Sequence, residues 1–326
     1  MNIFMQNINS FSQHIYFLCG LLLIFCASST NAQTSRKVTI TIDDLPFVGQ
    51  SESIETAAET TDKMLAAITK YKIPAAAFVT GKRVLVEGQV NQRLDLLRRW
   101  RDSGVSLENH GLSHISFQQT PLREYLDDAL QGMLFPEMIM KEKGGAVKFY
   151  RHPFNHTGAT MESRLAFENF LKERNIRLAP FTVEHADYVF NRLYEEAKQH
   201  QKEPEMKRIG EAYLAHLDTA FDFAERLSLE TFGRDIPQIF LIHASEINAD
   251  YLDRMLARLQ KRGYKFTSLE EAMTDSAYET PDVYVGGTGI SWFHRWRVGL
   301  KMEKRLRDEP DPPKWVIDEY QKLSSD

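Results

Sequence analysis

Short strand-like segments alternate with helical segments along most of the chain, and this alternation restricts the fold more than any other feature of the sequence. The first segment alternates Val38, Ile40 and Ile42 with threonines, a period-two pattern of β-branched residues that is typical of a strand. The further expected strands are 75–79, 105–107, 147–150, 176–181, 238–242 and 264–267. The expected helices are 53–71, 90–102, 121–142, 160–174, 189–231, 249–262 and a last one that opens with a capping box at 268–271. This order favours a parallel α/β architecture.

Clusters of polar residues follow nearly every expected strand. They lie at 43–44, 108–114, 151–155, 184–187 and 243. An open parallel sheet concentrates its site at one switch point, whereas a barrel gathers functional groups from the ends of many strands. The repeated clusters therefore favour a (β/α) barrel with a functional site at the carboxyl ends of its strands.

Two of these clusters hold carboxylate and imidazole groups. Asp43 and Asp44 directly follow the first strand, where a barrel places catalytic groups, although Asp is also common in turns and helix N-caps. His110 and His114 are four residues apart, so a helical segment would place both rings on one face, at a spacing that can chelate a metal ion. Two histidines and one aspartate would form a metal site with open coordination positions.

Three further residues at strand ends can be interpreted in two ways. Arg151 precedes a Pro-containing turn that would fix its guanidinium, or it is a surface arginine. Asp187 either pairs with a cation or caps the helix that follows it. His243 ends an apolar strand, where a single histidine is often a hydrogen-bonded core residue. Each residue alone also fits a structural role.

Composition narrows the possible functions. The formal net charge of -5 and the pI near 6.1 give no electrostatic argument for nucleic-acid binding. Hydrophobic residues make up 43% and charged residues 26%, as in an ordinary globular protein. Both cysteines, Cys19 and Cys26, lie in the apolar run 15–26. Any metal bound by the rest of the chain must therefore be held by histidines and carboxylates.

The apolar run 15–26 is too short to span a bilayer and resembles the core of a signal peptide. We expect residues 1–32 to be a signal peptide, export to the periplasm, and no membrane span after cleavage. No Lys or Arg precedes Arg36, so the usual basic n-region is missing. An uncleaved N-terminal anchor is therefore the alternative.

Taken together, five short motifs resemble those of a known family. TIDDLP, NHGLSH, RHPF, EHADY and LIH follow the order of the motifs of the polysaccharide deacetylases, the NodB-homology group or carbohydrate esterase family 4. The resemblance covers about residues 37–273. It implies a distorted (β/α) barrel of the NodB-homology type over 33–280, with a helical insertion at about 189–235 and a C-terminal extension, 281–326, packed on the barrel.

The resemblance also implies a metal site. Asp44, His110 and His114 match the metal-binding residues of the family. The implied cofactor is a divalent metal ion, zinc with cobalt as the alternative.

Five residues match the catalytic positions of the family. Asp43 matches the general base and Arg151 the arginine that positions it. His243 matches the general acid, and Asp187 the aspartate that holds the arginine or the acid in place. The backbone N–H of Phe154 matches the oxyanion donor. The implied reaction is the removal of acetyl groups from an acetylated carbohydrate, an N-acetylated amino sugar rather than an O-acetylated hemicellulose.

The sequence departs from the family at the site. Leu45 stands where Gly is usual, Glu184 replaces an Asp, and Tyr188 replaces a Trp. These changes leave two alternatives: a carbohydrate-binding protein on the same fold that has lost catalysis, and a related C–N hydrolase that acts on a small molecule. All the metal-binding and acid–base residues are nevertheless present.

The C-terminal extension contains three glycines at 286–289, the tryptophans Trp292 and Trp296, and a proline-rich segment. We expect a loop to lay Trp292 and Trp296 over one end of the barrel, with a sugar subsite as the alternative role. The run 301–307 is expected to be a solvated helix face, and the prolines of 310–313 to mark an extended tail. The aromatic residues of the insertion are expected to pack in the core.

Overall fold

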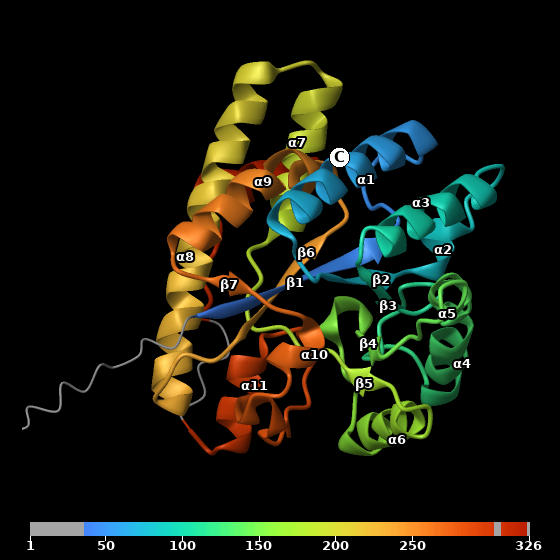
Figure 1. Ribbon diagram of the computed structural model, residues 1–326. Helices are drawn as coiled ribbons and strands as arrows, with labels where there is room; N and C mark the ends of the chain where they lie inside the picture. Colours follow the sequence, from blue (N-terminus) through green and yellow to red (C-terminus); the bar gives the residue numbers. More distant parts are fainter. Residues whose placement is uncertain (1–35, 303–307, 325–326) are drawn as a thin grey trace, which may run out of the picture. The chain divides into compact units, whose positions relative to one another are not determined.

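The computed structural model describes residues 36–302 and 308–324, and within them seven parallel strands form one sheet (Figure 1). The strands are β1 (Lys37–Leu45), β2 (Ala76–Val79), β3 (Ser106–Asn109), β4 (Phe149–Tyr150), β5 (Arg177–Leu178), β6 (Gln238–His243) and β7 (Lys265–Phe266). Their order is β5-β4-β3-β2-β1-β6, and β7 also pairs with β1. The predicted signal peptide lies outside the described residues.

Strand β1 is the centre of the sheet. It is buried from Val38 to Leu45, as expected for a parallel strand that is covered on both faces. Strand β6 pairs with β1 from Val38 to Asp43, whereas β2 pairs with the end of β1 and β7 with its beginning. In this register Asp43 lies opposite His243. The sheet therefore brings together the polar ends of two strands that are far apart in the sequence.

The chain after β5 joins the two sides of the sheet. The Ala179 N–H donates to the carbonyl of Tyr150 in β4 at 2.8 Å, and the Thr182 N–H donates to the carbonyl of Ile239 in β6 at 2.9 Å. This segment therefore links one edge of the sheet to the other and curls it. The curled parallel sheet with its surrounding helices confirms the predicted distorted (β/α) barrel.

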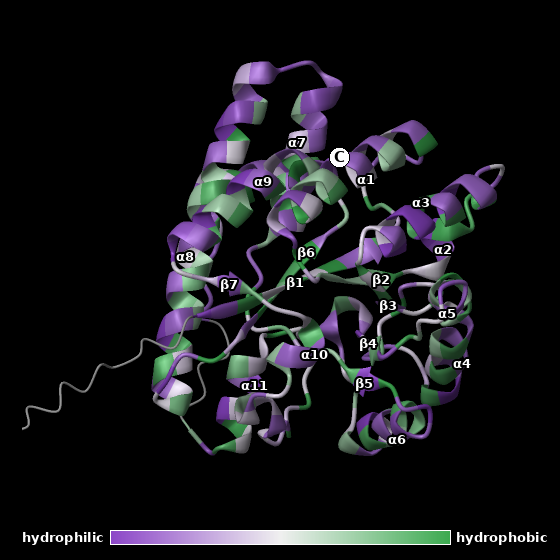
Figure 2. Cartoon of the chain, in the orientation of Figure 1, coloured by the Kyte–Doolittle hydropathy of each residue, from purple (hydrophilic) through white to green (hydrophobic). Residues whose placement is uncertain are grey.

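Helices surround the strands. They are α1 (Ile54–Tyr71), α2 (Gly81–Val84), α3 (Val90–Asp102), α4 (Leu122–Gly132), α5 (Leu134–Lys141), α6 (Met161–Lys172), α7 (Asp187–Gln199), α8 (Glu203–Phe232), α9 (Glu246–Lys261), α10 (Leu269–Ala272), α11 (Trp292–Gly299) and α12 (Lys314–Leu323), with 3-10 turns η1 (Pro153–Asn155) and η2 (Ser276–Glu279). Ser53 caps α1 by accepting from the N–H groups of Glu55 and Thr56. Figure 2 shows hydrophilic and hydrophobic residues on the same helices, as expected when one face packs on the sheet. No helix among these is long and apolar enough to cross a bilayer.

Several predicted element boundaries are wrong. The expected helix 121–142 is two helices that meet at Met133, and the expected helix 189–231 is two helices separated by residues 200–202. The expected strand 176–181 keeps regular pairing only at 177–178, because the chain then turns toward β6. The last predicted helix has only four residues.

The insertion is a helical pair. Helices α7 and α8 pack on each other, and α7 also packs on α9 and α12. Tyr213 and Phe221 of α8 are fully buried, which confirms that the aromatic residues of the insertion are core residues.

The C-terminal extension differs from the prediction in two places. Trp292 and Trp296 lie in helix α11, and both are buried, 5% and 1% exposed, because α11 packs on α8. The expectation of a loop there is wrong, and neither indole is available as a sugar platform. The expected extended tail is also wrong beyond Pro313, because α12 begins at Lys314. The predicted helix face 301–307 lies mostly outside the described residues.

Candidate active site

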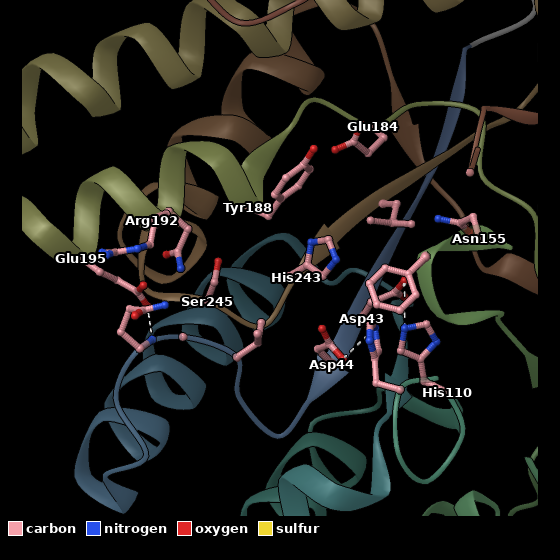
Figure 3. A pocket seen from close by; sticks show the side chains of 18 of the residues that line it. Asp43, Asp44, His110, Asn155, Glu184, Tyr188, Arg192, Glu195, His243 and Ser245 are labelled. Carbon is pink, nitrogen blue, oxygen red and sulfur yellow. Dashed lines mark hydrogen bonds and ion pairs between the residues drawn. The ribbon is translucent and has the colours of Figure 1, made fainter. Parts of the chain in front are cut away.

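The two aspartates at the end of β1 line one cavity (Figure 3). Neighbouring strand residues normally point to opposite sides. Asp44, however, has φ of 67°, a left-handed conformation that Asp tolerates better than most residues, and the pairing of β1 with β2 shifts register there. Both carboxylates are almost completely buried. The break in the strand therefore places two acidic groups side by side at the bottom of the cavity.

Asp44, His110 and His114 come together as predicted. Each offers a ligand atom, and the three atoms lie within 4.8 Å of one another. The helix that was considered for 110–114 is absent, since the segment is a loop in which Gly111 has φ of 77° and His114 of 54°. The histidine pair therefore owes its geometry to a loop after β3 and not to helical spacing.

Asp128 of α4 holds that loop, and the sequence analysis missed it. Its carboxylate accepts hydrogen bonds from the N–H groups of Leu112, at 2.9 Å, and Ser113, at 3.0 Å. The only sequence signal was a pair of adjacent aspartates, Asp127 and Asp128, in an amphipathic helix, where such residues usually face solvent. A fixed loop of this kind keeps the two imidazoles close without a regular element.

The three residues fit a divalent metal ion. The ring Nδ1 of His110 lies 2.9 Å from the carbonyl of Arg151, so Nδ1 donates and Nε2 keeps its lone pair toward the site. Burial lowers the pKa of His114 to about 4, although Asp44 opposes the shift, so this ring is neutral at pH 7. Burial alone would raise the pKa of Asp44, but Arg83 and the nearby histidines hold it well below its usual range. Two imidazoles and one carboxylate are a donor set that zinc accepts.

Two further contacts to Asp44 were not predicted. The hydroxyl of Thr80 donates to Oδ1 at 2.7 Å, and the Nη2 of Arg83 donates to Oδ2 at 3.2 Å. Both residues follow β2: Thr80 precedes α2 and Arg83 lies in it. Asp44 is therefore held in place from a second strand end.

Arg151 is completely buried and contacts Asp43. Its Nη1 donates to Asp43 Oδ1 and to the hydroxyl of Thr41, both at 2.8 Å, and Nη2 donates to the carbonyl of Pro180 at 3.0 Å. The guanidinium also lies over the ring of Phe78, 4.3 Å from its centroid. The surface-loop alternative for Arg151 is thus wrong, and the arginine orients the Asp43 carboxylate.

His243 is held by Asp187, which begins α7. The ring Nδ1 lies 2.7 Å from Asp187 Oδ1, and the His243 N–H donates to Oδ2 at 2.7 Å. Asn248 donates to the same Oδ2 at 2.6 Å. Burial opposes the charged ring, yet Asp187, Asp44 and Asp43 together raise the pKa of His243 to about 10. The imidazole is therefore an oriented proton donor at neutral pH.

Phe154 also lines the cavity. It sits in the turn η1 with φ of 57°, and its side chain is 52% exposed. Its ring contacts that of His114, with centroids 4.5 Å apart. The left-handed backbone at this position is a strained conformation for a bulky residue, and it turns the main chain of η1 next to a metal-ligand candidate.

The cavity has a volume of about 850 Å³ and reaches well beyond these groups. Its wall includes Glu184 and Tyr188, the two residues of the fourth motif that differ from the family pattern. Glu184 accepts from the N–H of Ala186 at 2.7 Å, and burial together with Asp187 and Glu309 raises its pKa to about 7. The cavity is also lined by Tyr320 and Leu323 of α12, which were not predicted because the tail was expected to be extended.

Fold and site together define a parallel α/β barrel with three histidines and three aspartates gathered at the carboxyl ends of its strands. The sequence model of the polysaccharide deacetylase family matches residues 30–170. The match confirms the predicted resemblance for that part of the chain to the polysaccharide deacetylases, which are hydrolases that act on carbon–nitrogen bonds. The matched range includes Asp44, His110 and His114 but not His243.

Two solved structures of low identity, with TM-scores of 0.51 and 0.50, share the fold, and a third is similar at a lower score. A mutant of the carbohydrate esterase family 4 pseudoenzyme BA3943 with restored enzymatic activity has a TM-score of 0.51 and 17% identity, over 74% of this chain and 68% of that chain. The wild-type pseudoenzyme, from Bacillus anthracis, has a TM-score of 0.50 and 16% identity, over 74% and 66%. The peptidoglycan deacetylase PdaC from Bacillus subtilis has 0.47 and 21%, over 76% and 96%. A search of curated proteins found no match.

Proposed function

We propose that the protein is a metal-dependent deacetylase of an acetylated carbohydrate, and that N-acetylated amino sugars are its preferred substrates. The observation that carries the proposal is the meeting of Asp43, Asp44, His110, His114 and His243 in one cavity. The family match over residues 30–170 supports the reaction type. The preference for amino sugars follows from the resemblance. We also propose export to the periplasm, on the basis of the apolar run 15–26.

Asp44, His110 and His114 would hold the metal ion, zinc in our proposal and cobalt as the alternative. A divalent ion at this position supplies Lewis acidity, which activates water at neutral pH and polarises an acyl oxygen. The neutral ring of His114 and the charged Asp44 are ready to bind without losing protons at pH 7.

Asp43 is the proposed general base. One carboxylate oxygen, Oδ1, accepts from Arg151, and the other, Oδ2, lies 3.8 Å from His110 Nε2. Arg151 therefore fixes the orientation of the carboxylate and leaves Oδ2 facing the proposed metal ligands. That oxygen is the one placed to accept a proton from a water molecule in the cavity.

His243 is the proposed general acid. Deacetylation needs a proton for the amine that leaves, because an amide nitrogen is a poor leaving group. Asp187 binds Nδ1, so the Nε2 proton is the one available to the substrate. The backbone N–H of Phe154 is the proposed oxyanion donor, and losing such a donor typically costs about 100- to 1000-fold in rate.

The test measures acetate release by protein that has been stripped of metal and then given zinc or cobalt. The substrates are chitooligosaccharides, peptidoglycan fragments and acetylated xylan, and Asp43→Asn and His114→Ala are the inactive controls. Metal-dependent release that both substitutions abolish supports the proposal and identifies the substrate class. Sugar binding without acetate release supports the carbohydrate-binding alternative. Turnover of small amides together with indifference to oligosaccharides supports the small-molecule hydrolase.

A further inference from the structure

Asn248 of α9 contacts both members of the proposed acid pair, Asp187 and His243. It is completely buried and is not among the residues that line the cavity. Its amide nitrogen, Nδ2, donates to Asp187 Oδ2 at 2.6 Å and to the His243 carbonyl at 2.9 Å. A carboxylate and a backbone carbonyl can only accept hydrogen bonds, so the nitrogen side of the amide must face them. The amide oxygen of Asn248 therefore points the other way.

That amide oxygen meets a hydroxyl group of the helical insertion. The hydroxyl of Tyr213 in α8 donates to Asn248 Oδ1. Tyr213 is completely buried, and burial together with Asp187 and Glu184 raises the pKa of its hydroxyl well above the ordinary value. The ring packs on His185 of the fourth motif, with centroids 4.6 Å apart. Tyr213 is thus a fixed and permanently protonated donor.

These hydrogen bonds form one buried path from α8 to the proposed acid. Tyr213 donates to Asn248, and Asn248 donates to Asp187 Oδ2. The other oxygen of Asp187, Oδ1, binds the Nδ1 of His243 at 2.7 Å. Without the Tyr213 hydroxyl the amide of Asn248 is free to turn, and its oxygen would then repel the Asp187 carboxylate. Helices α7, α8 and α9, which carry the path, pack against one another (Figure 1).

We propose that Tyr213 and Asn248 are positioning residues for the general acid. Together they fix the Asp187 carboxylate in the orientation that holds the His243 ring with Nε2 toward the cavity. This inference rests on the proposed deacetylase function and deepens it, because it gives the insertion a role in turnover although Tyr213 does not line the cavity. Both residues lie outside the range that the family model matches, 30–170.

The kinetic test measures kcat and KM for acetate release from the β-1,4-linked tetramer of N-acetylglucosamine by zinc-loaded protein. The variants are Tyr213→Phe, Asn248→Ala and the double variant. Tyr194→Phe is the matched control, because Tyr194 is another buried tyrosine of the insertion. Its hydroxyl also donates to α9, to Asp250 Oδ2 at 2.7 Å, but does not reach Asp187. Melting curves for each variant set a temperature at which all of them are folded.

We expect Tyr213→Phe to lower kcat about 3- to 10-fold and Asn248→Ala roughly 10- to 100-fold. These are the ranges for losing one neutral hydrogen bond and one hydrogen bond to a charged group. KM should stay the same in both variants, because neither side chain lines the cavity. The double variant should be no slower than Asn248→Ala, since Tyr213 acts only through the amide. Tyr194→Phe should keep the parent kcat.

A second measurement needs no substrate. In protein with isotope-labelled histidines, the Nδ1 proton of His243 should give a far-downfield NMR signal, because it takes part in a charge-assisted hydrogen bond to Asp187. Loss of the signal in His243→Gln identifies it. We expect the signal to shift or broaden in Tyr213→Phe and to stay in place in Tyr194→Phe.

Three results would overturn the proposal. They are a Tyr213→Phe variant that behaves like Tyr194→Phe in both measurements, losses of kcat that multiply in the double variant, and a raised KM at unchanged kcat. If Asn248→Ala does not fold, the comparison of Tyr213→Phe with Tyr194→Phe decides alone. Absence of acetate release by the parent protein would reject the proposed deacetylase function. An NMR signal that moves in Tyr213→Phe and not in Tyr194→Phe would then still support the path to His243.

Discussion

Arg83 and His114 contact the same carboxylate, that of Asp44. Arg83 Nε lies 3.1 Å from Asp44 Oδ1, and His114 Nε2 lies 3.6 Å from the same oxygen. The carboxylate proposed to bind a metal ion is thus already paired with a fixed positive charge of the protein. A metal ion bound there would lie close to a like charge.

Replacing Arg83 should therefore strengthen metal binding. We expect Arg83→Gln to bind zinc about 10-fold more tightly, since removing a unit charge a few ångströms from the ion relieves at least ~1 kcal/mol of repulsion. Arg83→Lys keeps the charge and Lys82→Gln removes an exposed neighbouring charge, so both should change affinity little. Competition with a chromophoric chelator measures the affinities. Weaker binding in Arg83→Gln would show instead that the arginine positions Asp44.

Removing one predicted ligand should release the metal. His114→Ala leaves one histidine and one carboxylate, so we expect the purified variant to lose its metal on dialysis while the parent protein keeps one ion per chain. His156→Ala is the matched control, because His156 bonds to Ser116 and is outside the three-residue group. Metal analysis by mass spectrometry gives the stoichiometry, and an unchanged metal content in His114→Ala would contradict the assignment.

Asp43→Asn should separate catalysis from metal binding. We expect kcat to fall at least about 100-fold, the usual effect of losing a general base, with zinc content unchanged. The buried Arg151 also loses its charged partner, so the melting temperature should fall. Thr41→Val removes a neutral hydrogen bond to the same Arg151 Nη1 and should preserve most of the activity. Equal rate losses in the two variants would argue that Asp43 only orients the arginine.

The pair of His243 and Asp187 should set the alkaline limit of activity. Because the pKa of His243 is raised to about 10, the proposed acid stays protonated well above neutrality. Asp187→Asn removes the main partner that raises this pKa, so the alkaline limb of kcat/KM should move to lower pH. Asn191→Ala, another substitution in α7, should leave the limb in place. A profile unchanged by Asp187→Asn would exclude His243 as the group that titrates.

The same pair affects stability in two pH windows. The folded-state pKa of His243 is about 10 against an ordinary 6.5, so its stabilising effect is complete below pH 6.5 and is lost as the pH rises through 10. Against the effect of burial, His243 lowers the pKa of Asp187 to about 2 from 3.8, so that contribution is present above pH 3.8 and is lost as the pH falls through 2. Urea unfolding of metal-free protein across pH should show both losses, and Asp187→Asn should flatten both.

Trp296 should contribute to the stability of the fold and not to sugar binding. Its indole is 1% exposed and contacts Phe232 and Tyr278 edge-on, so Trp296→Ala leaves a large cavity. We expect the free energy of unfolding to fall by about 3–5 kcal/mol, with oligosaccharide affinity unchanged at a temperature where the variant is folded. Urea unfolding and calorimetry check the two effects. A selective loss of sugar binding would restore the sugar-subsite alternative for this residue.

The position of the site at the strand ends could be predicted, because each strand and the polar residues that follow it are adjacent in the sequence. The alternation of Val38, Ile40 and Ile42 predicts β1, and parallel strands necessarily bring their carboxyl ends to one edge. The sequence therefore placed Asp43, Asp44, His110, Arg151 and His243 in one region. The roles of these residues remain predictions from the family resemblance.

The rest depends on contacts between distant parts of the chain. His110 and His114 are brought together by a loop that Asp128 holds in place. The two rings are therefore close in space, as predicted, although the segment between them is not a helix. Arg83 reaches Asp44 from a different strand end. Helix α12 forms where prolines suggested an extended tail, because α7 offers it a packing surface. Periodicity within one segment contains none of this information.

The pairing of β1 with β6 has a consequence for synthesis. Thr41 of β1 bonds to the carbonyl of Phe240, 199 residues further along the chain. Until the ribosome has made β6, one edge of the central strand has no partner, and an unpaired edge can associate with other chains. Any fragment that ends before residue 238 lacks both the proposed acid and this edge partner. We expect such fragments to aggregate, so the chain acquires its native barrel only after three quarters of it has been synthesised.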